Sequence, residues 1–208
     1  AHANHVRVYV TLNVMPRTSE YDNLLIYIRY LHEIGADAAI VSDIGVLALI
    51  RENVPDLEVH ISTQASAVSA ATCRAYHALG AKRVVLAREL TLREIAEIRR
   101  DTPRSLELEA FVHGSMCIAY SGRCLLSQHF TGRDANRGMC TQPCRWNYRV
   151  RNAVYELVEE KRPDMPIPIT EDGGETFIMS SKDMCMIEHI PELMESGLDS
   201  FKIEGRMK

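Results

Sequence analysis

An α/β fold of repeated strand–helix units is predicted by three observations. Short β-branched runs alternate with segments of helical period through the first 112 residues. A long irregular stretch follows, and the pattern returns near the C-terminus. Each early strand also ends in polar or charged residues. Such units predict a mainly parallel sheet, and polar strand ends favour a TIM-type barrel, whose active site lies at the carboxyl ends of its strands.

The individual strands and helices can be placed in order along the chain. Strands are predicted at residues 6–12, 38–41, 57–61, 83–86 and 106–112. Helices are predicted at 21–31, 46–51, 65–79 and 92–100. Near the end we expect a short strand at 177–179, a helix at 186–194 and a strand at 200–203. A complete barrel has eight strands and about 250 residues, so we predict an incomplete (β/α)8 barrel with about six to seven strands.

Composition and regional character divide the chain into three parts. Residues 1–114 are predicted to be barrel units, 115–176 a cysteine- and arginine-rich insertion, and 177–208 a final barrel unit. Hydrophobic residues make up 46% and charged residues 25%, as in ordinary globular proteins. No apolar run approaches the roughly 20 residues that span a bilayer, and the first residues do not have the pattern of a secretory signal. We therefore expect no membrane association and a cytoplasmic location.

Polar residues at the strand ends are candidates for an active site. They are Thr11, Asn13, Ser42, Asp43, Thr63, Gln64, Arg88, Glu89 and His113. Ser42 or Asp43 is expected to cap a helix. From this group and the last strand end we take Arg88, His113, Glu204 and Arg206 as candidate catalytic residues, and Asn13 and Gln64 as candidate substrate-binding residues. His113 is equally compatible with a hydrogen-bonded structural role.

Four clustered cysteines predict a metal site. Cys117, Cys124, Cys140 and Cys144 lie within 28 residues, with spacing x6, x15 and x3. Four thiolates are the usual ligands of an iron–sulfur cluster, whereas zinc sites with four cysteine ligands mostly use paired short C-x2-4-C knuckles. The spacing favours a cluster, with zinc, and then free thiols or disulfides, as alternatives. Cys73 and Cys185 lie on predicted helices and are interpreted as core residues.

The insertion is also strongly basic, although the whole chain has a net charge of −4. Residues 117–151 contain six arginines and one aspartate, so this stretch carries +5 and the remainder −9. We predict that Arg133, Arg137, Arg145 and Trp146 bind an anionic substrate, because arginines interleaved with aromatic rings can hold phosphates and stack on unpaired bases. The alternatives are a solvated arginine-rich loop and a tryptophan packed beneath it.

The signature residues of the insertion resemble those of the collagenase-like peptidase family U32. The resemblance rests on residues 109–117 (EAFVHGSMC) and 121–127 (SGRCLLS), and extends to 133–140, 142–145, 180–183 and 201–206. Members usually begin with two further βα units, so the resemblance implies that the chain is a fragment of a longer protein. Two missing strands would leave two open sheet edges, which we expect another copy or a partner chain to fill.

Family resemblance implies a choice between two activities. Some U32 members are labelled proteases without an established mechanism, and the chain has no His-Glu-x-x-His or Gly-x-Ser-x-Gly motif. Others carry an iron–sulfur cluster on four such cysteines and hydroxylate transfer RNA, ribosomal RNA or a ubiquinone precursor without molecular oxygen.

Residues 144–148 and 187–191 look most similar to the tRNA branch, which makes 5-hydroxyuridine at the wobble position and depends on prephenate. Ser180 stands where members commonly have Asn. The resemblance therefore implies a 4Fe-4S cluster on the four cysteines, tRNA as partner and prephenate as a small anionic co-substrate. A peptidase, and a binding module with a structural metal, are the alternatives.

Overall fold

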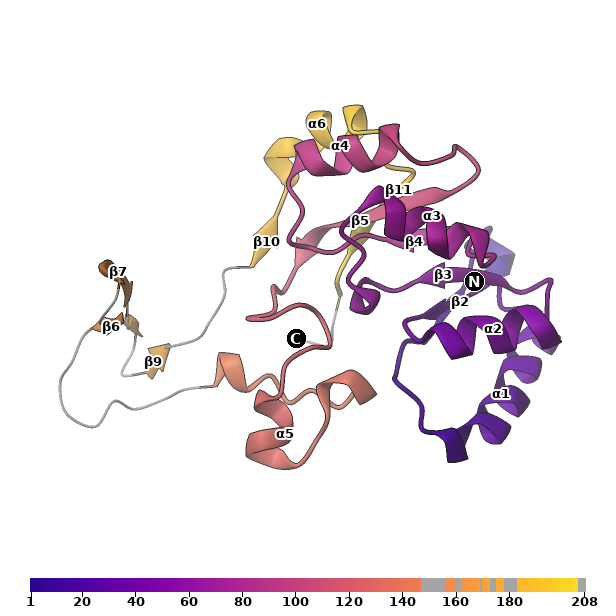
Figure 1. Cartoon of the computed structure of the whole chain (residues 1–208), viewed down its shortest axis with the longest axis horizontal. Helices are drawn as coiled ribbons and strands as arrows, with labels where there is room; N and C mark the ends of the chain where they lie inside the picture. The colour runs from indigo at the N-terminus through magenta and orange to yellow at the C-terminus, as the bar shows by residue number, and fades with distance from the viewer. Residues whose placement is uncertain (147–155, 160–161, 169, 173–174, 178–182, 206–208) are drawn as a thin grey trace.

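A mainly parallel sheet forms the centre of the molecule (Figure 1). In the computed structural model the described residues are 1–146, 156–159, 162–168, 170–172, 175–177 and 183–205. The first five strands pair in chain order, all parallel: β1 (Tyr9–Leu12), β2 (Ala38–Val41), β3 (Glu58–Ile61), β4 (Arg83–Val85) and β5 (Glu107–Gly114). β11 (Ser200–Ile203) pairs parallel with β5, and the two-residue β10 (Met184–Cys185) pairs antiparallel with the end of β5.

This sheet is a curled half-barrel, as the sequence predicts. Within the described part of the chain, β1 pairs only with β2 and β11 only with β5, so the barrel is open between these two strands. Small antiparallel pairs lie outside this sheet: β6 (Glu156–Glu159) with β7 (Arg162–Pro168), and β8 (Thr170–Asp172) with β9 (Glu175–Phe177). The fold class is therefore confirmed as an incomplete (β/α) barrel.

Helices connect the first five parallel strands. The described α-helices are α1 (Tyr21–Glu33), α2 (Ile44–Asn53), α3 (Ala70–Ala78), α4 (Leu92–Arg100), α5 (Leu126–Thr131) and α6 (Ile190–Glu195). Of these, α2, α3 and α4 begin at side-chain caps that the sequence provides. Asp43 accepts a hydrogen bond from the Val46 backbone N–H at 3.0 Å, so the predicted cap of α2 is confirmed. The described residues also form short 3-10 helices: η1 (His2–Asn4), η2 (Thr18–Glu20), η3 (Thr63–Ala65), η4 (Ala135–Arg137), η5 (Pro143–Arg145) and η6 (Ile187–His189).

The apolar core lies between one face of the sheet and the helices. Alternate strand residues such as Val41, Val59, Val84 and Leu108 are buried against helical residues such as Ile50. Cys73 on α3 is fully buried in the same core, as predicted. Strands whose two faces are both covered read as nearly continuous apolar runs, and β2 shows this with four buried residues in succession.

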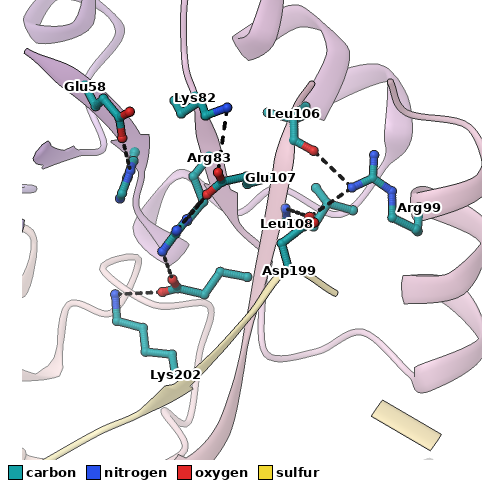
Figure 2. Close-up of polar contacts among 11 residues, drawn as sticks. Glu58, Lys82, Arg83, Arg99, Leu106, Glu107, Leu108, Asp199 and Lys202 are labelled. Carbon is teal, nitrogen blue, oxygen red and sulfur yellow. Dashed lines mark hydrogen bonds and ion pairs between the residues drawn. The ribbon is translucent and has the colours of Figure 1, made fainter. Parts of the chain in front are cut away.

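The other face of the sheet carries charged side chains, unlike the packed aliphatic layers usual in a closed TIM barrel (Figure 2). Arg83 on β4 forms ion pairs with Glu107 at 2.6 Å and Glu109 at 2.8 Å, both on β5. Glu109 also pairs with Lys202 on β11 at 3.3 Å. Burial, and then the nearby Arg83, lower the pKa of His60 on this face. The ion pairs therefore join three neighbouring strands beneath the strand ends.

The C-terminal part differs from prediction in three respects. The strand expected at 177–179 is instead β9, which ends at Phe177 and pairs outside the main sheet; residues 178–182 lie outside the described residues. The predicted apolar helix face at 186–194 buries only Leu193, because α6 is six residues long, while Ile187 and Met194 are 75% and 68% exposed. Cys185 is not a helical core residue: it lies exposed on β10.

Among the described residues, no helix combines the length and apolar character required to cross a membrane.

Candidate active site

A pocket of about 370 Å³ lies at the carboxyl ends of the barrel strands. Its lining comes from three sources: the strand ends, the cysteine-rich segment after β5, and the end of β11. The polar and sulfur-bearing lining residues include Thr11, Asn13, Ser62, Thr63, Gln64, Arg88, Ser115, Ser121, Cys117, Cys124, Cys140, Gln142, Cys144, Arg145, Lys202 and Glu204. The predicted polar strand ends and the predicted metal ligands therefore meet in one space.

Two carboxamides form one wall of this pocket. Asn13 follows β1, and its Nδ2 donates to the hydroxyl of Ser62 at 3.4 Å. Gln64 follows β3, and its Oε1 accepts from the Ser42 hydroxyl at 3.5 Å. Gly122 of the cysteine segment packs against Gln64, because a Cβ on Gly122 would lie 3.3 Å from Gln64 Cγ. Both amides are thus oriented by neighbouring strand ends.

Arg88 and Glu204, which also line the pocket, form a largely buried ion pair. Nη1 of Arg88 donates to Oε2 of Glu204 at 3.2 Å, and the two side chains are 9% and 14% exposed. The same nitrogen donates to the Ser115 carbonyl, and the Ser115 backbone N–H donates to Glu204 at 3.2 Å. The Arg88 guanidinium also lies 3.9 Å from the centroid of the Phe111 ring, a cation–π contact. The turn after β5 is therefore fixed to the end of β11.

Hydrogen bonds also fix the cysteine-rich segment to the barrel. Arg137 pairs with Glu20 at 2.6 Å, and the Met15 backbone N–H donates to the Asn136 carbonyl at 3.1 Å. Arg145 pairs with Asp183, directly before β10, at 2.7 Å, and within the segment it donates to the Met116 carbonyl at 3.3 Å. These contacts hold a segment of short helices and turns over the strand ends.

All four predicted metal ligands line the pocket. Backbone N–H groups of Leu126 and Gln142 donate to Cys124 Sγ and Cys140 Sγ, each at 3.4 Å. Burial raises the pKa of the Cys144 thiol; Arg145 acts against this, and the charges of Cys117, Cys140 and Cys124 add to the rise. Within the described residues, no group of three or more His, Cys, Asp or Glu is arranged around a single point suited to one metal ion.

The cysteine set fits an iron–sulfur cluster in its chemistry. Four thiols share one pocket, where gathered thiolate charge would need a cationic centre to balance it. Backbone N–H donors to two of the sulfurs are the kind of outer hydrogen bond that tunes such clusters.

Several predicted site residues lie elsewhere. His113 is exposed and is not among the pocket-lining residues, although its backbone carbonyl accepts a hydrogen bond from the Glu204 backbone N–H at 2.9 Å. Arg133 is exposed outside the pocket, and the Arg137 guanidinium is engaged by Glu20. Arg206 lies outside the described residues. Asn13, Gln64, Arg88, Glu204, Arg145 and the four cysteines do meet in the pocket.

Trp146 is hydrogen-bonded and packed on one side but remains partly exposed. The residue is 37% exposed, its ring lies 5.8 Å from the Phe130 ring, and its Nε1 donates to the Thr141 carbonyl at 3.0 Å. The tryptophan is therefore anchored to the cysteine segment while part of its surface stays accessible.

Sequence reasoning missed Phe111 and Lys202, which also line the pocket. Both lie within strands, where the polar-end criterion does not apply. The spacing of Lys202 and Glu204, two residues apart, was a usable signal, because strand residues i and i+2 share a face.

The chain is thus an incomplete (β/α) barrel of the TIM type, with a cysteine-lined pocket at its strand ends. The model of peptidase family U32 matches residues 1–208, and the chain therefore belongs to this family.

Known relatives agree with this assignment. The chain is 38% identical over 240 residues to tRNA hydroxylation protein P of Escherichia coli (strain K12), covering 100% of this chain and 53% of that protein. It is 42% identical over 207 residues to tRNA hydroxylation protein P1 of Bacillus subtilis (strain 168), covering 97% and 46%. The chain thus spans about half the length of these curated relatives.

The fold also matches a solved structure, that of the U32 peptidase Mk0906. The TM-score is 0.58 at 17% identity, covering 100% of this chain and 73% of that one. This likeness supports the barrel-type fold.

Proposed function

We propose that the protein is an iron–sulfur enzyme that hydroxylates the wobble uridine of tRNA to 5-hydroxyuridine without molecular oxygen, with prephenate as co-substrate. The observation that carries the proposal is the pocket in which four cysteines meet the polar strand ends. The names of the relatives, tRNA hydroxylation proteins P and P1, support RNA hydroxylation as the activity. We also place the protein in the cytoplasm, where thiols stay reduced.

The pocket residues have different roles in the proposed reaction. Cys117, Cys124, Cys140 and Cys144 would hold a 4Fe-4S cluster, which supplies one-electron chemistry when bound. Asn13 and Gln64 offer amide donors and acceptors that can pair with the edge of an extruded uracil. Arg145 lies at the pocket with a guanidinium able to contact an RNA phosphate. Arg88 and Glu204 fix the wall against which these groups act.

The test is nucleoside mass analysis of tRNA from a deletion strain that also lacks any paralogous gene. We expect 5-hydroxyuridine-type nucleosides to disappear and to return with the full-length wild-type gene. Return of the nucleosides with a gene lacking all four pocket cysteines would refute a role for the metal site. Unchanged nucleosides in the deletion strain would refute the activity itself.

The peptidase alternative has less support from the pocket. A cysteine or serine protease needs a base beside its nucleophile, and no histidine is among the described residues that line the pocket. Purified full-length protein should therefore leave gelatin intact. Cleavage that is lost on one substitution of Cys117 or Ser115 would instead favour a peptidase.

Zinc is the alternative metal. An anaerobic preparation assayed for iron, acid-labile sulfide and zinc distinguishes an iron–sulfur cluster from a zinc site. Zinc without iron would favour a structural metal and a binding module.

A further inference from the structure

Two cations flank one aromatic ring on the floor of the pocket. Phe111 lies on β5, directly across from Lys202 on β11 in the strand register. The Lys202 ammonium is 5.4 Å from the Phe111 ring centroid, and the Arg88 guanidinium, which follows β4, is 3.9 Å from it. Because β4 and β11 pair with β5 on its two sides, the two cations approach Phe111 from neighbouring strands. All three residues line the pocket.

Each cation is held by a carboxylate, and Lys202 keeps donors for a ligand. Glu204 accepts from Nη1 of Arg88, and Glu109 pairs with Lys202 at 3.3 Å. Nε of Arg88 is buried, and no hydrogen-bond partner for it is found among the described residues. An ammonium group has three donors, and in the described part of the chain the one carboxylate that Lys202 contacts is Glu109. Because Lys202 lines the pocket and its side chain is 29% exposed, the remaining ammonium donors can reach a ligand acceptor there.

The ion pairs beneath the pocket leave positive charge in excess. They form a chain from Lys82 through Glu107, Arg83 and Glu109 to Lys202, and dashed lines in Figure 2 mark these ion pairs. Three cations face two carboxylates along this chain, so its net charge is +1. Glu109 is shared with the nearly buried Arg83 and therefore neutralises Lys202 only in part. The member that reaches the pocket is Lys202, where its side chain is 29% exposed.

We propose that Arg88 and Lys202 together form a binding site for one carboxylate group of a small co-substrate, with Glu109 positioning Lys202. The inference rests on the proposed function, and it locates the binding site of the anionic co-substrate in the pocket. Phe111 and Lys202 belong to the strands themselves, whereas the cysteines belong to the segment after β5. The floor therefore suits a small molecule beneath the reacting base more than a phosphate of the RNA backbone.

The test is calorimetric titration of the full-length protein, purified anaerobically with its metal, using prephenate and, separately, inorganic phosphate. We expect Lys202→Met to weaken prephenate binding about tenfold or more, the loss of one hydrogen bond between charged groups. The matched Lys202→Arg variant keeps the charge and should bind prephenate more tightly than Lys202→Met. Phosphate should bind weakly and be insensitive to either change.

Three results would overturn the site: no prephenate binding by the wild-type protein, equal binding by Lys202→Met, or phosphate binding as tight as that of prephenate. If Lys202→Met fails to fold, the double variant Glu109→Gln with Lys202→Met is titrated in its place, because this variant removes both charges of the ion pair. Binding that depends on Lys202 without tRNA hydroxylation would refute the proposed function alone. Hydroxylation with Lys202-independent binding would refute this inference alone.

Discussion

The guanidinium of Arg137 forms two hydrogen bonds with the carboxylate of Glu20, at 2.6 Å from Nη2 and 3.1 Å from Nη1. Nη1 also donates to the Met15 carbonyl at 3.1 Å. Paired contacts of this kind fix orientation as well as distance. Because Arg137 lies three residues before Cys140 and Glu20 lies at the start of the first barrel helix, this contact positions one side of the cysteine set against the barrel.

Replacing Arg137 should therefore loosen the proposed metal site. We expect Arg137→Met to lower the iron bound per chain and to speed proteolysis between α5 and η5, because the segment loses its attachment to Glu20 and Met15. Arg133→Met, at an exposed arginine in the same segment, is the matched control and should behave as wild type. Equal iron content in the two variants would contradict an anchoring role for Arg137.

Acid should break the same contact. The hydrogen bond from Arg137, and then that from the Arg17 backbone N–H, lower the pKa of Glu20 from 4.5 to about 2. A depressed folded-state pKa contributes stability that is present above about pH 4.5 and is lost as the pH falls toward 2. Glu20→Gln should thus be less stable than wild type in urea near neutral pH, with the difference shrinking across that window. A difference independent of pH would mean that the carboxylate charge is not responsible.

The four pocket cysteines should each be needed for the metal, and the remaining exposed one should not. We expect Ser substitutions at Cys117, Cys124, Cys140 or Cys144 to remove most of the iron and sulfide, because a hydroxyl is a poor ligand for a cluster. Cys185→Ser is the control, since Cys185 is exposed on β10 and does not line the pocket. Full iron content in any of the four variants would exclude that cysteine as a ligand.

The sequence was sufficient to predict that many of these residues would lie near one another, because the signals were local. Asn13, Gln64 and Arg88 follow strands directly, and parallel strand ends meet at one edge, so their convergence follows from topology. The cysteines were identified by number and spacing. His113 illustrates the limit: β5 continues to Gly114, and its pairing with β11 shifts register between Lys202 and Ile203, which no local pattern reveals.

Side chains within the strands were harder to assign. A strand covered on both faces lacks a clear alternation, so the sequence could not tell which residues of β5 face the helices and which face the pocket. Phe111 was missed for this reason, whereas Lys202 was missed because it lies within β11 and not at the strand end. Cys185 was assigned to a helix because apolar residues follow it, whereas the structure places it on a two-residue strand. Such short antiparallel additions depend on tertiary pairing alone.

Gly114 should be intolerant of a side chain. Its φ is +141°, and a Cβ there would lie 2.5 Å from Glu204 Cβ, so alanine must displace the partner of Arg88. Gly132→Ala is the control, because its φ of +69° is also unfavourable for alanine but nothing lies within 4 Å. We expect about 1 kcal/mol of destabilisation for the control and about 1 to 3 kcal/mol more for Gly114→Ala in urea unfolding. Equal losses would mean that Glu204 moves freely.

Arg99 should be the most costly charged residue to replace on the helical side of the barrel. Its side chain is 3% exposed and donates to the carbonyls of Leu106, Thr102 and Pro103 at 3.0, 3.2 and 2.6 Å. It also pairs with Asp199 at 3.0 Å, and Figure 2 shows this contact beside the Leu106 hydrogen bond. Asp199 directly precedes β11, so Arg99 connects α4 to the strand that carries Lys202.

Breaking this connection removes several hydrogen bonds from one buried cation. We expect Arg99→Met to lower the free energy of unfolding by about 3 kcal/mol or more, because three carbonyls and one carboxylate lose their donor. The adjacent Arg100 is 70% exposed and pairs only with Asp101 in the described part of the chain. Arg100→Met should therefore change stability by less than about 0.5 kcal/mol. Similar effects of the two substitutions in urea unfolding would show that the Arg99 contacts do not hold β11 in the sheet.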